Sequence, residues 1–140
     1  MTVLGFDYGM RNIGVAVGQS VTGTASPLCT LPIRRGKPDW QAIEALLSTW
    51  SPDLAVVGEP VNMDGSDQSM TTAARRFARQ LHGRFGLQVQ HADERLTTVE
   101  ARAELAAAGR LDRSDHPIAA QIIVESWFRT LDVAKPDWTS

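Results

Sequence analysis

Acidic residues stand where several apolar runs of this chain come to an end. They are Asp7, Glu59, the neighbouring pair Asp93 and Glu94, and Asp115 before the last helical pattern. Strand ends in an α/β sheet deliver side chains to a shared crevice, where converging carboxylates raise one another's pKa. A divalent cation removes that penalty, and oxygen ligands select Mg²⁺ or Mn²⁺. Because such ions activate water for attack on a phosphodiester, the spacing indicates a metal-dependent hydrolase.

The same residues also have plain structural interpretations. Asp93 and Glu94 can cap the turn before the following helix, with Arg95 as an ion-pair partner. Asp115 can serve as the N-cap of the last helix. Asp7 stands two residues before a glycine, which is also typical of a simple turn. The residues alone leave both interpretations open at each position.

Basic residues supply the second half of a nuclease site, because they neutralise phosphates. Arg11 and Arg95 adjoin the acidic positions and are the first candidates for substrate binding. Arg75 and Arg79 share one helix face with His82, as expected either for a phosphate-binding surface or for an ordinary solvated face. His82 and His91 lie outside any metal-ligand spacing and are expected to be structural or exposed. Further basic groups are Arg34, Arg35, Lys37 and Arg102.

Size and composition restrict the class of protein. A chain of 140 residues predicts one domain over residues 1–140. The formal net charge of −2 argues against a general polyanion-coating protein. Cys29 is the single cysteine, so neither an intramolecular disulfide nor a cysteine-based zinc site is expected, and it is predicted to be a small buried apolar residue. Short apolar runs and the lack of a signal-like start predict a cytoplasmic protein with no membrane contact.

The first half of the chain predicts three strands joined by short turns, over residues 3–9, 13–18 and 28–31. Residues 21–27 are turn-prone, and residues 34–38 are expected to form an exposed basic loop. Strands in this succession form an antiparallel meander. Asp39 predicts the N-cap of a helix that runs through Trp50 and ends at residues 51–52. Trp40 and Trp50 lie on its apolar stripe and are expected to pack in the core or an interface.

Strands and helices alternate in the second half. Strands are predicted over residues 54–58 and 87–91, and helices begin at Thr71 or Thr72, at Thr97 and near residue 115. The last helix is expected to continue to about Leu131, followed by a loosely held tail over residues 132–140. This order predicts an α/β fold with a five-stranded mixed sheet, an antiparallel meander followed by parallel strands, flanked by helices.

Several segments resemble the YqgF/RuvX family of bacterial ribonuclease-H-like proteins, over nearly the full length of the chain. The matching pieces are Phe6-Asp7-Tyr8-Gly9, Ile13-Gly14-Val15-Ala16-Val17-Gly18, Val56-Val57-Gly58 with Pro60, Asn62-Met63-Asp64-Gly65, Gly83-Arg84-Phe85-Gly86, and Asp93-Glu94-Arg95-Leu96-Thr97-Thr98-Val99-Glu100-Ala101. The last block is the most specific. The resemblance implies a ribonuclease-H-like fold and a metal-dependent nuclease that processes the 5′ end of precursor 16S ribosomal RNA.

The resemblance also implies which residues of this chain form the acidic site. It implies Glu94 as a member of that site, and the predicted metal ligands are therefore Asp7, Glu94 and Asp115. Where the family has an aspartate at the start of the last helix, this chain has His116, one residue after Asp115. Either Asp115 reaches the metal, or His116 is itself a ligand or general base, or the site is weakened.

Glu59 is a second departure, because the family pattern has an apolar residue there. A glutamate follows the equivalent central strand in related junction resolvases. Glu59 is therefore either an additional ligand or a solvated loop residue, and we favour the loop residue.

Functions of different classes compete. A nuclease acting on precursor rRNA is the first, and a resolvase that cleaves four-way DNA junctions uses the same chemistry but requires a two-fold dimer. The sequence leaves monomer and homodimer open. The substitution at His116 supports a catalytically silent RNA-binding module of ribosome assembly. A nucleotide-binding protein of the actin or sugar-kinase type also opens with a strand and Asp-x-Gly, but it needs two such domains and a phosphate-binding loop.

Overall fold

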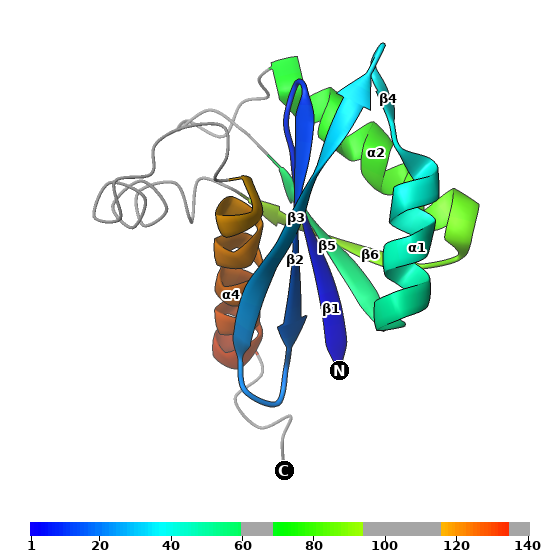
Figure 1. Cartoon of the computed structure of the whole chain (residues 1–140). Coiled ribbons are helices and arrows are strands. Elements are labelled where there is room, and N and C mark those ends of the chain that lie inside the picture. The colour runs from blue at the N-terminus through cyan, green and yellow to red at the C-terminus, as the bar shows by residue number, and fades with distance from the viewer. Residues whose placement is uncertain (60–68, 94–115, 135–140) are drawn as a thin grey trace.

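A computed structural model of the chain shows a twisted sheet with helices on both of its faces (Figure 1). It describes residues 1–59, 69–93 and 116–134. The strands of this part are β1 (Thr2–Tyr8), β2 (Asn12–Gln19), β3 (Thr24–Arg34), β4 (Lys37–Pro38), β5 (Leu54–Glu59) and β6 (Gln88–Asp93), and the helices are α1 (Trp40–Trp50), α2 (Ser69–Phe85) and α4 (His116–Ala134). None of these helices has the length and apolar character to cross a bilayer.

The strand order is β4-β3-β2-β1-β5-β6. β1, β2 and β3 pair antiparallel, and β1, β5 and β6 pair parallel. The predicted α/β class and the change from an antiparallel meander to parallel strands are therefore confirmed. The predicted count of five strands is wrong by one, because the short β4 pairs with the end of β3.

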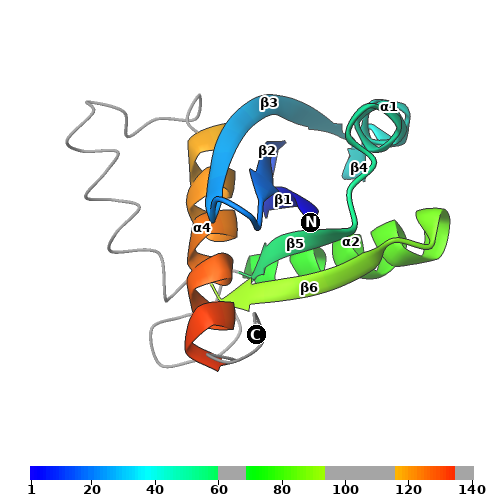
Figure 2. The same ribbon diagram turned by 90° about the horizontal axis from the view of Figure 1, so that it is seen from below.

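Alternation along β1 divides the core into two layers. Leu4, Phe6 and Tyr8 belong to the cluster that packs against α1 and α2, whereas Val3 belongs to the cluster that packs against α4. Figure 2 shows α4 on one face of the sheet and α1 and α2 on the other. Successive side chains of a strand point to opposite faces, so any residue of β1 is assigned to a face by its position alone.

Two glycines let α4 lie directly on the sheet. A Cβ at Gly5 would clash with Val124 and would come within 3.1 Å of the carbonyl oxygen of Ala120. A Cβ at Gly18, which pairs with the start of β1, would come within 2.6 Å of Val124 and 3.0 Å of Phe128. Phe128 thus lies at the start of β1, whereas Ala120, two turns earlier in the helix, lies over Gly5. α4 therefore runs antiparallel to β1.

The helix α1 follows its sequence signals closely. The side chain of Asp39 accepts a hydrogen bond from the N–H of Ala42 at 3.1 Å, so Asp39 is the predicted N-cap, and Ser51 closes the helix with a left-handed backbone. Trp40 stacks on Phe77 with ring centroids 5.6 Å apart, which confirms its predicted packing role. Trp50 is instead 37% exposed at the end of the helix.

Other element boundaries differ from the sequence prediction. β3 begins at Thr24 and not at residue 28, and a register shift opposite Val15 and Ala16 accommodates Pro27 within it. α2 begins at Ser69, so Thr71 is a buried helical residue and not a cap. α4 continues to Ala134, three residues into the predicted tail. The predicted helix at Thr97 lies outside the described residues.

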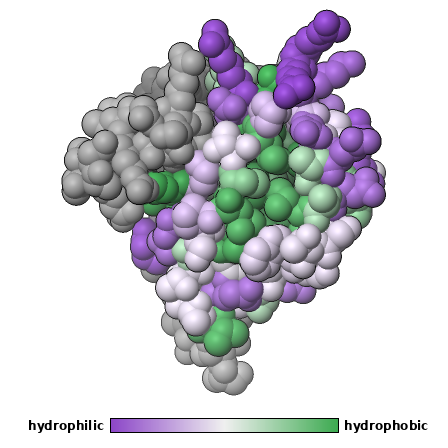
Figure 3. Space-filling model, viewed as in Figure 1, coloured by the Kyte–Doolittle hydropathy of each residue, from purple (hydrophilic) through white to green (hydrophobic). Residues whose placement is uncertain are grey.

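β3 presents a partly apolar outer surface. Leu28 and Ile33 of β3 and Leu46 and Leu47 of α1 are half-buried against the core. Figure 3 shows apolar side chains gathered over β3 and the adjacent side of α1, with hydrophilic side chains projecting at the end that carries the β3–β4 turn. Cys29 is also half-buried in β3, and this burial raises the pKa of its thiol.

The contact between Gly5 and α4 gives the first prediction. Gly5→Ala is expected to lower the free energy of unfolding by about 1–3 kcal/mol, because the new methyl group overlaps Val124 and the helix backbone. Urea unfolding measures the change. Adding Val124→Ala should recover part of the loss, since it empties the space that the methyl group needs.

Gly83→Ala is the matched control. A Cβ at Gly83 meets nothing within 4 Å in α2, so this variant should be neutral or stabilising by up to about 1 kcal/mol. An unfolding midpoint of Gly5→Ala equal to that of the unmodified chain would contradict the packing described for α4.

Candidate functional site

Three acidic residues stand at the same end of the sheet. Asp7 is the penultimate residue of β1, Glu59 is the last residue of β5, and Asp93 is the last residue of β6. β1, β5 and β6 are parallel neighbours, and Glu59 is in register with Asp93. The backbones of Asp7, Glu59 and Asp93 therefore end up at the same end of three parallel strands.

The pleat of the strands nevertheless separates Asp7 from Glu59. Phe6 of β1 is in register with Val57 of β5, and both side chains lie in the cluster beneath α1 and α2. Asp7 follows Phe6 by one residue and therefore points to the α4 face. Glu59 follows Val57 by two residues and therefore points to the α2 face. The sheet itself lies between these two carboxylates.

The N-terminus of α4 stands beside Asp7. Ala120 lies over Gly5, and two further residues of β1 advance about 7 Å to Asp7. One turn back along α4, about 6 Å, brings the helix to His116, its first residue. Figure 1 shows α4 starting toward the end of the sheet at which β1 stops. The helix terminus that carries partial positive charge therefore lies at the same end of the sheet, and on the same face, as the half-buried Asp7.

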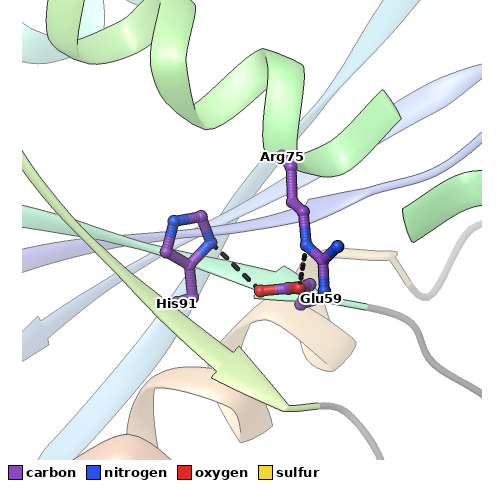
Figure 4. Close-up of polar contacts among 3 residues, drawn as sticks. All are labelled: Glu59, Arg75 and His91. Carbon is purple, nitrogen blue, oxygen red and sulfur yellow. Dashed lines mark hydrogen bonds and ion pairs between the residues drawn. The ribbon is translucent and has the colours of Figure 1, made fainter. Parts of the chain in front are cut away.

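Glu59 joins α2 to β6 on the opposite face (Figure 4). Its Oε1 accepts a hydrogen bond from Nε of Arg75, and its Oε2 lies 3.2 Å from Nδ1 of His91. The Glu59 side chain is only 15% exposed, whereas those of Arg75 and His91 are 41% and 45% exposed. Because a carboxylate removed from water needs compensating partners, these two contacts account for its presence at the strand end.

The prediction that Glu59 is a solvated loop residue is wrong. It belongs to β5, is largely buried and has two charged or polar partners. The alternative, an additional ligand next to Asp7, does not fit either, since the two side chains leave the sheet on opposite faces. Parity along β1 and β5 therefore decides a question that residue types left open.

The basic candidates occupy different places. Arg11 is exposed in the turn between β1 and β2, at the same sheet end as Asp7, and its carbonyl accepts a hydrogen bond from the N–H of Ile33 at 2.8 Å. Arg75 contacts Glu59, and Arg79 is exposed on α2. A separate hollow of about 310 Å³ lies at the β3–β4 turn, where Arg34 and Lys37 are among the lining residues.

Several predicted site residues lie outside the described residues. These are Glu94, Arg95 and Asp115, together with Asn62-Met63-Asp64-Gly65 and Arg102. His116 is described as the first residue of α4. Among residues 1–59, 69–93 and 116–134, no group of three His, Cys, Asp or Glu side chains could hold a metal ion. The metal-ligand set therefore stays a prediction, with Asp7 as the ligand that the structure describes.

The pairing of His91 with Glu59 was not predicted from the sequence. The alternation of residues 87–91 carried a usable signal, because it places His91 on the same face as Val89. His91 and His82 are both exposed, as predicted, and Nδ1 of His82 lies 3.0 Å from the carbonyl oxygen of Leu87.

Comparisons with known proteins agree with this architecture. The profile of the RuvX family, described as Holliday junction resolvase, matches residues 1–130. A relative from Pectobacterium carotovorum subsp. carotovorum, named "Putative pre-16S rRNA nuclease", is 55% identical over 131 residues, which cover 91% of this chain and 94% of the relative.

Two solved structures are similar in fold. Thermus thermophilus RuvC in complex with a Holliday junction substrate has a TM-score of 0.58 at 16% identity, covering 94% of this chain and 96% of that chain. The yeast mitochondrial Holliday junction resolvase has a TM-score of 0.59 at 11% identity, covering 98% and 81%. The ribonuclease-H-like fold expected from the sequence is thereby confirmed.

The Glu59 contacts give the second prediction. Glu59→Gln is expected to lower the free energy of unfolding by about 1 kcal/mol, since it removes the charge that Arg75 and His91 share while both partners stay partly solvated. Urea unfolding measures the change, and Glu44→Gln is the control. Glu44 is exposed on α1, so this substitution should change the free energy of unfolding by less than about 0.5 kcal/mol. Equal effects of the two variants would show that the Glu59 contacts contribute nothing.

Proposed function

The chain belongs to the RuvX family, and we propose that it is a metal-dependent nuclease that processes the 5′ end of precursor 16S rRNA. The family and the names of the relatives indicate a hydrolase that cleaves phosphodiester bonds. The rRNA substrate is favoured because the relative at 55% identity carries that name, whereas the resolvases share only the fold at 11–16% identity.

The position of Asp7 carries the proposal. It is a half-buried carboxylate at the end of a central strand, on the face covered by α4 and level with the first turn of that helix. A hard oxygen ligand at this place suits Mg²⁺ or Mn²⁺. Asp7, Glu94 and Asp115 would hold the ion, with His116 as the alternative third ligand or a general base. When bound, such an ion activates a water and stabilises the leaving oxygen of a phosphodiester.

The remaining residues have positioning roles in the proposal. Arg11, exposed in the turn that follows β1, binds a substrate phosphate at the sheet edge next to Asp7, and Arg95 binds a second one. The N-terminus of α4 adds partial positive charge on the same side, which favours the approach of a phosphate group. Arg75 positions Glu59, so of the two α2 arginines we assign only Arg79 to substrate.

The proposed role also implies where the protein acts and how many copies of the chain it needs. We assign residues 1–140 to one nuclease domain that acts in the cytoplasm, where precursor rRNA is made. Cleavage of rRNA at one strand does not require a second copy of the chain, whereas resolution of a four-way junction requires two sites related by two-fold symmetry.

Asp7→Asn gives the third prediction. It should reduce cleavage of a precursor 16S rRNA fragment in Mg²⁺ or Mn²⁺ by about a hundredfold or more, because loss of a metal ligand costs at least as much as loss of its outer hydrogen-bond partners. The variant should keep its circular dichroism spectrum and a cooperative unfolding transition. Gel analysis of the 5′ product under single-turnover conditions measures the rate.

Glu59→Gln is the control, since its carboxylate stands at the same sheet end but on the opposite face. At saturating RNA it should retain turnover per folded molecule. Loss of turnover in Glu59→Gln with activity kept in Asp7→Asn would reverse the assignment. If the unmodified chain binds RNA but cleaves it neither in Mg²⁺ nor in Mn²⁺, it is the catalytically silent binding module. If it cleaves a four-way DNA junction in preference to rRNA, it is a resolvase.

A further inference from the structure

A groove of about 600 Å³ opens between α2 and β6, on the face of the sheet opposite α4. Ala78 and Val89 form apolar parts of its lining. Arg79, His82 and His91 supply its polar side chains, and Gly86 and Gln88 complete the lining. None of the described residues that line it is acidic, so the groove combines an apolar floor with groups that suit an anionic chain.

Both histidines of the groove are fixed by contacts behind them. Nδ1 of His82 lies 3.0 Å from the carbonyl oxygen of Leu87, which requires a proton on that nitrogen. Nδ1 of His91 lies 3.2 Å from the carboxylate of Glu59, which favours the same tautomer. Each contact leaves Nε2 on the other side of the ring, where it can accept a hydrogen bond. The two imidazoles are thus oriented and not merely exposed.

The groove runs from the C-terminal end of α2 and the start of β6 to His91. It extends along β6 to His91, which is tied to Glu59 at the end of β5. β1 is two strands away from β6, a separation of about 10 Å, and Asp7 stands at the same sheet end on the far face. In the proposed function, an RNA chain that lies in the groove therefore crosses from the α2 face to the α4 face to reach Asp7.

These features lead us to infer that the groove holds a single-stranded segment of the RNA substrate a few nucleotides from the cleaved bond. Arg79 neutralises a phosphate, and the apolar floor receives a sugar or base face. The Nε2 atoms of the two histidines meet ribose hydroxyls and base edges, groups that are accessible in single-stranded RNA. The inference rests on the proposed nuclease function, and it assigns binding residues on the face away from Asp7.

Binding without cleavage tests the groove separately from the nuclease. A fluorescein-labelled single-stranded RNA decamer is titrated with the full chain in EDTA, and anisotropy reports the Kd at several salt concentrations. Arg79→Glu should weaken binding about tenfold and reduce the salt slope by roughly 0.7, as expected for the loss of one phosphate contact. Arg79→Lys, which keeps the charge, should recover most of the affinity.

Arg76→Glu is the matched control, because it makes the same change of charge on the same helix at an exposed residue outside the groove lining. It should weaken binding no more than about threefold. Equal losses in Arg76→Glu and Arg79→Glu would overturn the inference, since they would reflect only the general field of the protein. A DNA decamer of the same sequence bound as tightly as the RNA would overturn the assignment to RNA.

The histidine rings provide a local readout. In NMR spectra of the full chain, the side-chain resonances of His82 and His91 should shift when unlabelled RNA is added, and Arg79→Glu should abolish the shifts at the same RNA concentration. Unperturbed rings at saturating RNA would show that the groove is not the binding site, whatever the outcome of the cleavage experiments.

Discussion

The close approach of α4 to the β1–β2 hairpin is the constraint on which the rest of this structure depends. Gly5 and Gly18 have no side chains, and Val124 and Phe128 of α4 occupy the space that Cβ atoms would take. This contact fixes how far α4 extends along β1. The N-terminus of the helix consequently stands level with Asp7 and not above or below it. The placement of the proposed catalytic carboxylate beside positive helix-terminal charge is therefore a consequence of packing several residues away.

The pleat of the parallel strands then distributes charge between two faces. Asp7 leaves β1 toward α4, and Glu59 leaves β5 toward α2, although both stand at one sheet edge. Glu59 is compensated by Arg75 and His91, which also hold α2 and β6 together near that edge. In our proposal the α4 face carries the metal ligands, and the α2 face carries the groove for single-stranded RNA. In such an arrangement the two sites share an edge of the sheet without competing for the same carboxylate.

Much of the fold follows from local signals in the sequence. The cap at Asp39 and the helical spacing after it gave α1 with its observed bounds, and turn residues between apolar runs gave the hairpin of β1 and β2. β3 is longer than the sequence predicts, because much of it is exposed and contains Pro27, which a register shift accommodates. It therefore lacks the usual composition of a strand. The sheet faces toward which Asp7 and Glu59 point could not be predicted, because β1 and β5 are apolar on both faces. These strands show no alternation of apolar and polar residues from which a face could be assigned. The register that relates Phe6 to Val57 is a tertiary property, and it decides the face of the sheet on which each of the two acids lies.

The central claim is that Asp7, on the α4 face, is the carboxylate that receives the divalent ion. Anomalous diffraction from crystals soaked in Mn²⁺ tests it most directly, because it locates the ion independently of any activity. We predict a peak within bonding distance of an Asp7 carboxylate oxygen, on the side of the sheet covered by α4. A peak bound instead to Glu59 on the α2 face, with Asp7 devoid of metal, would contradict the account.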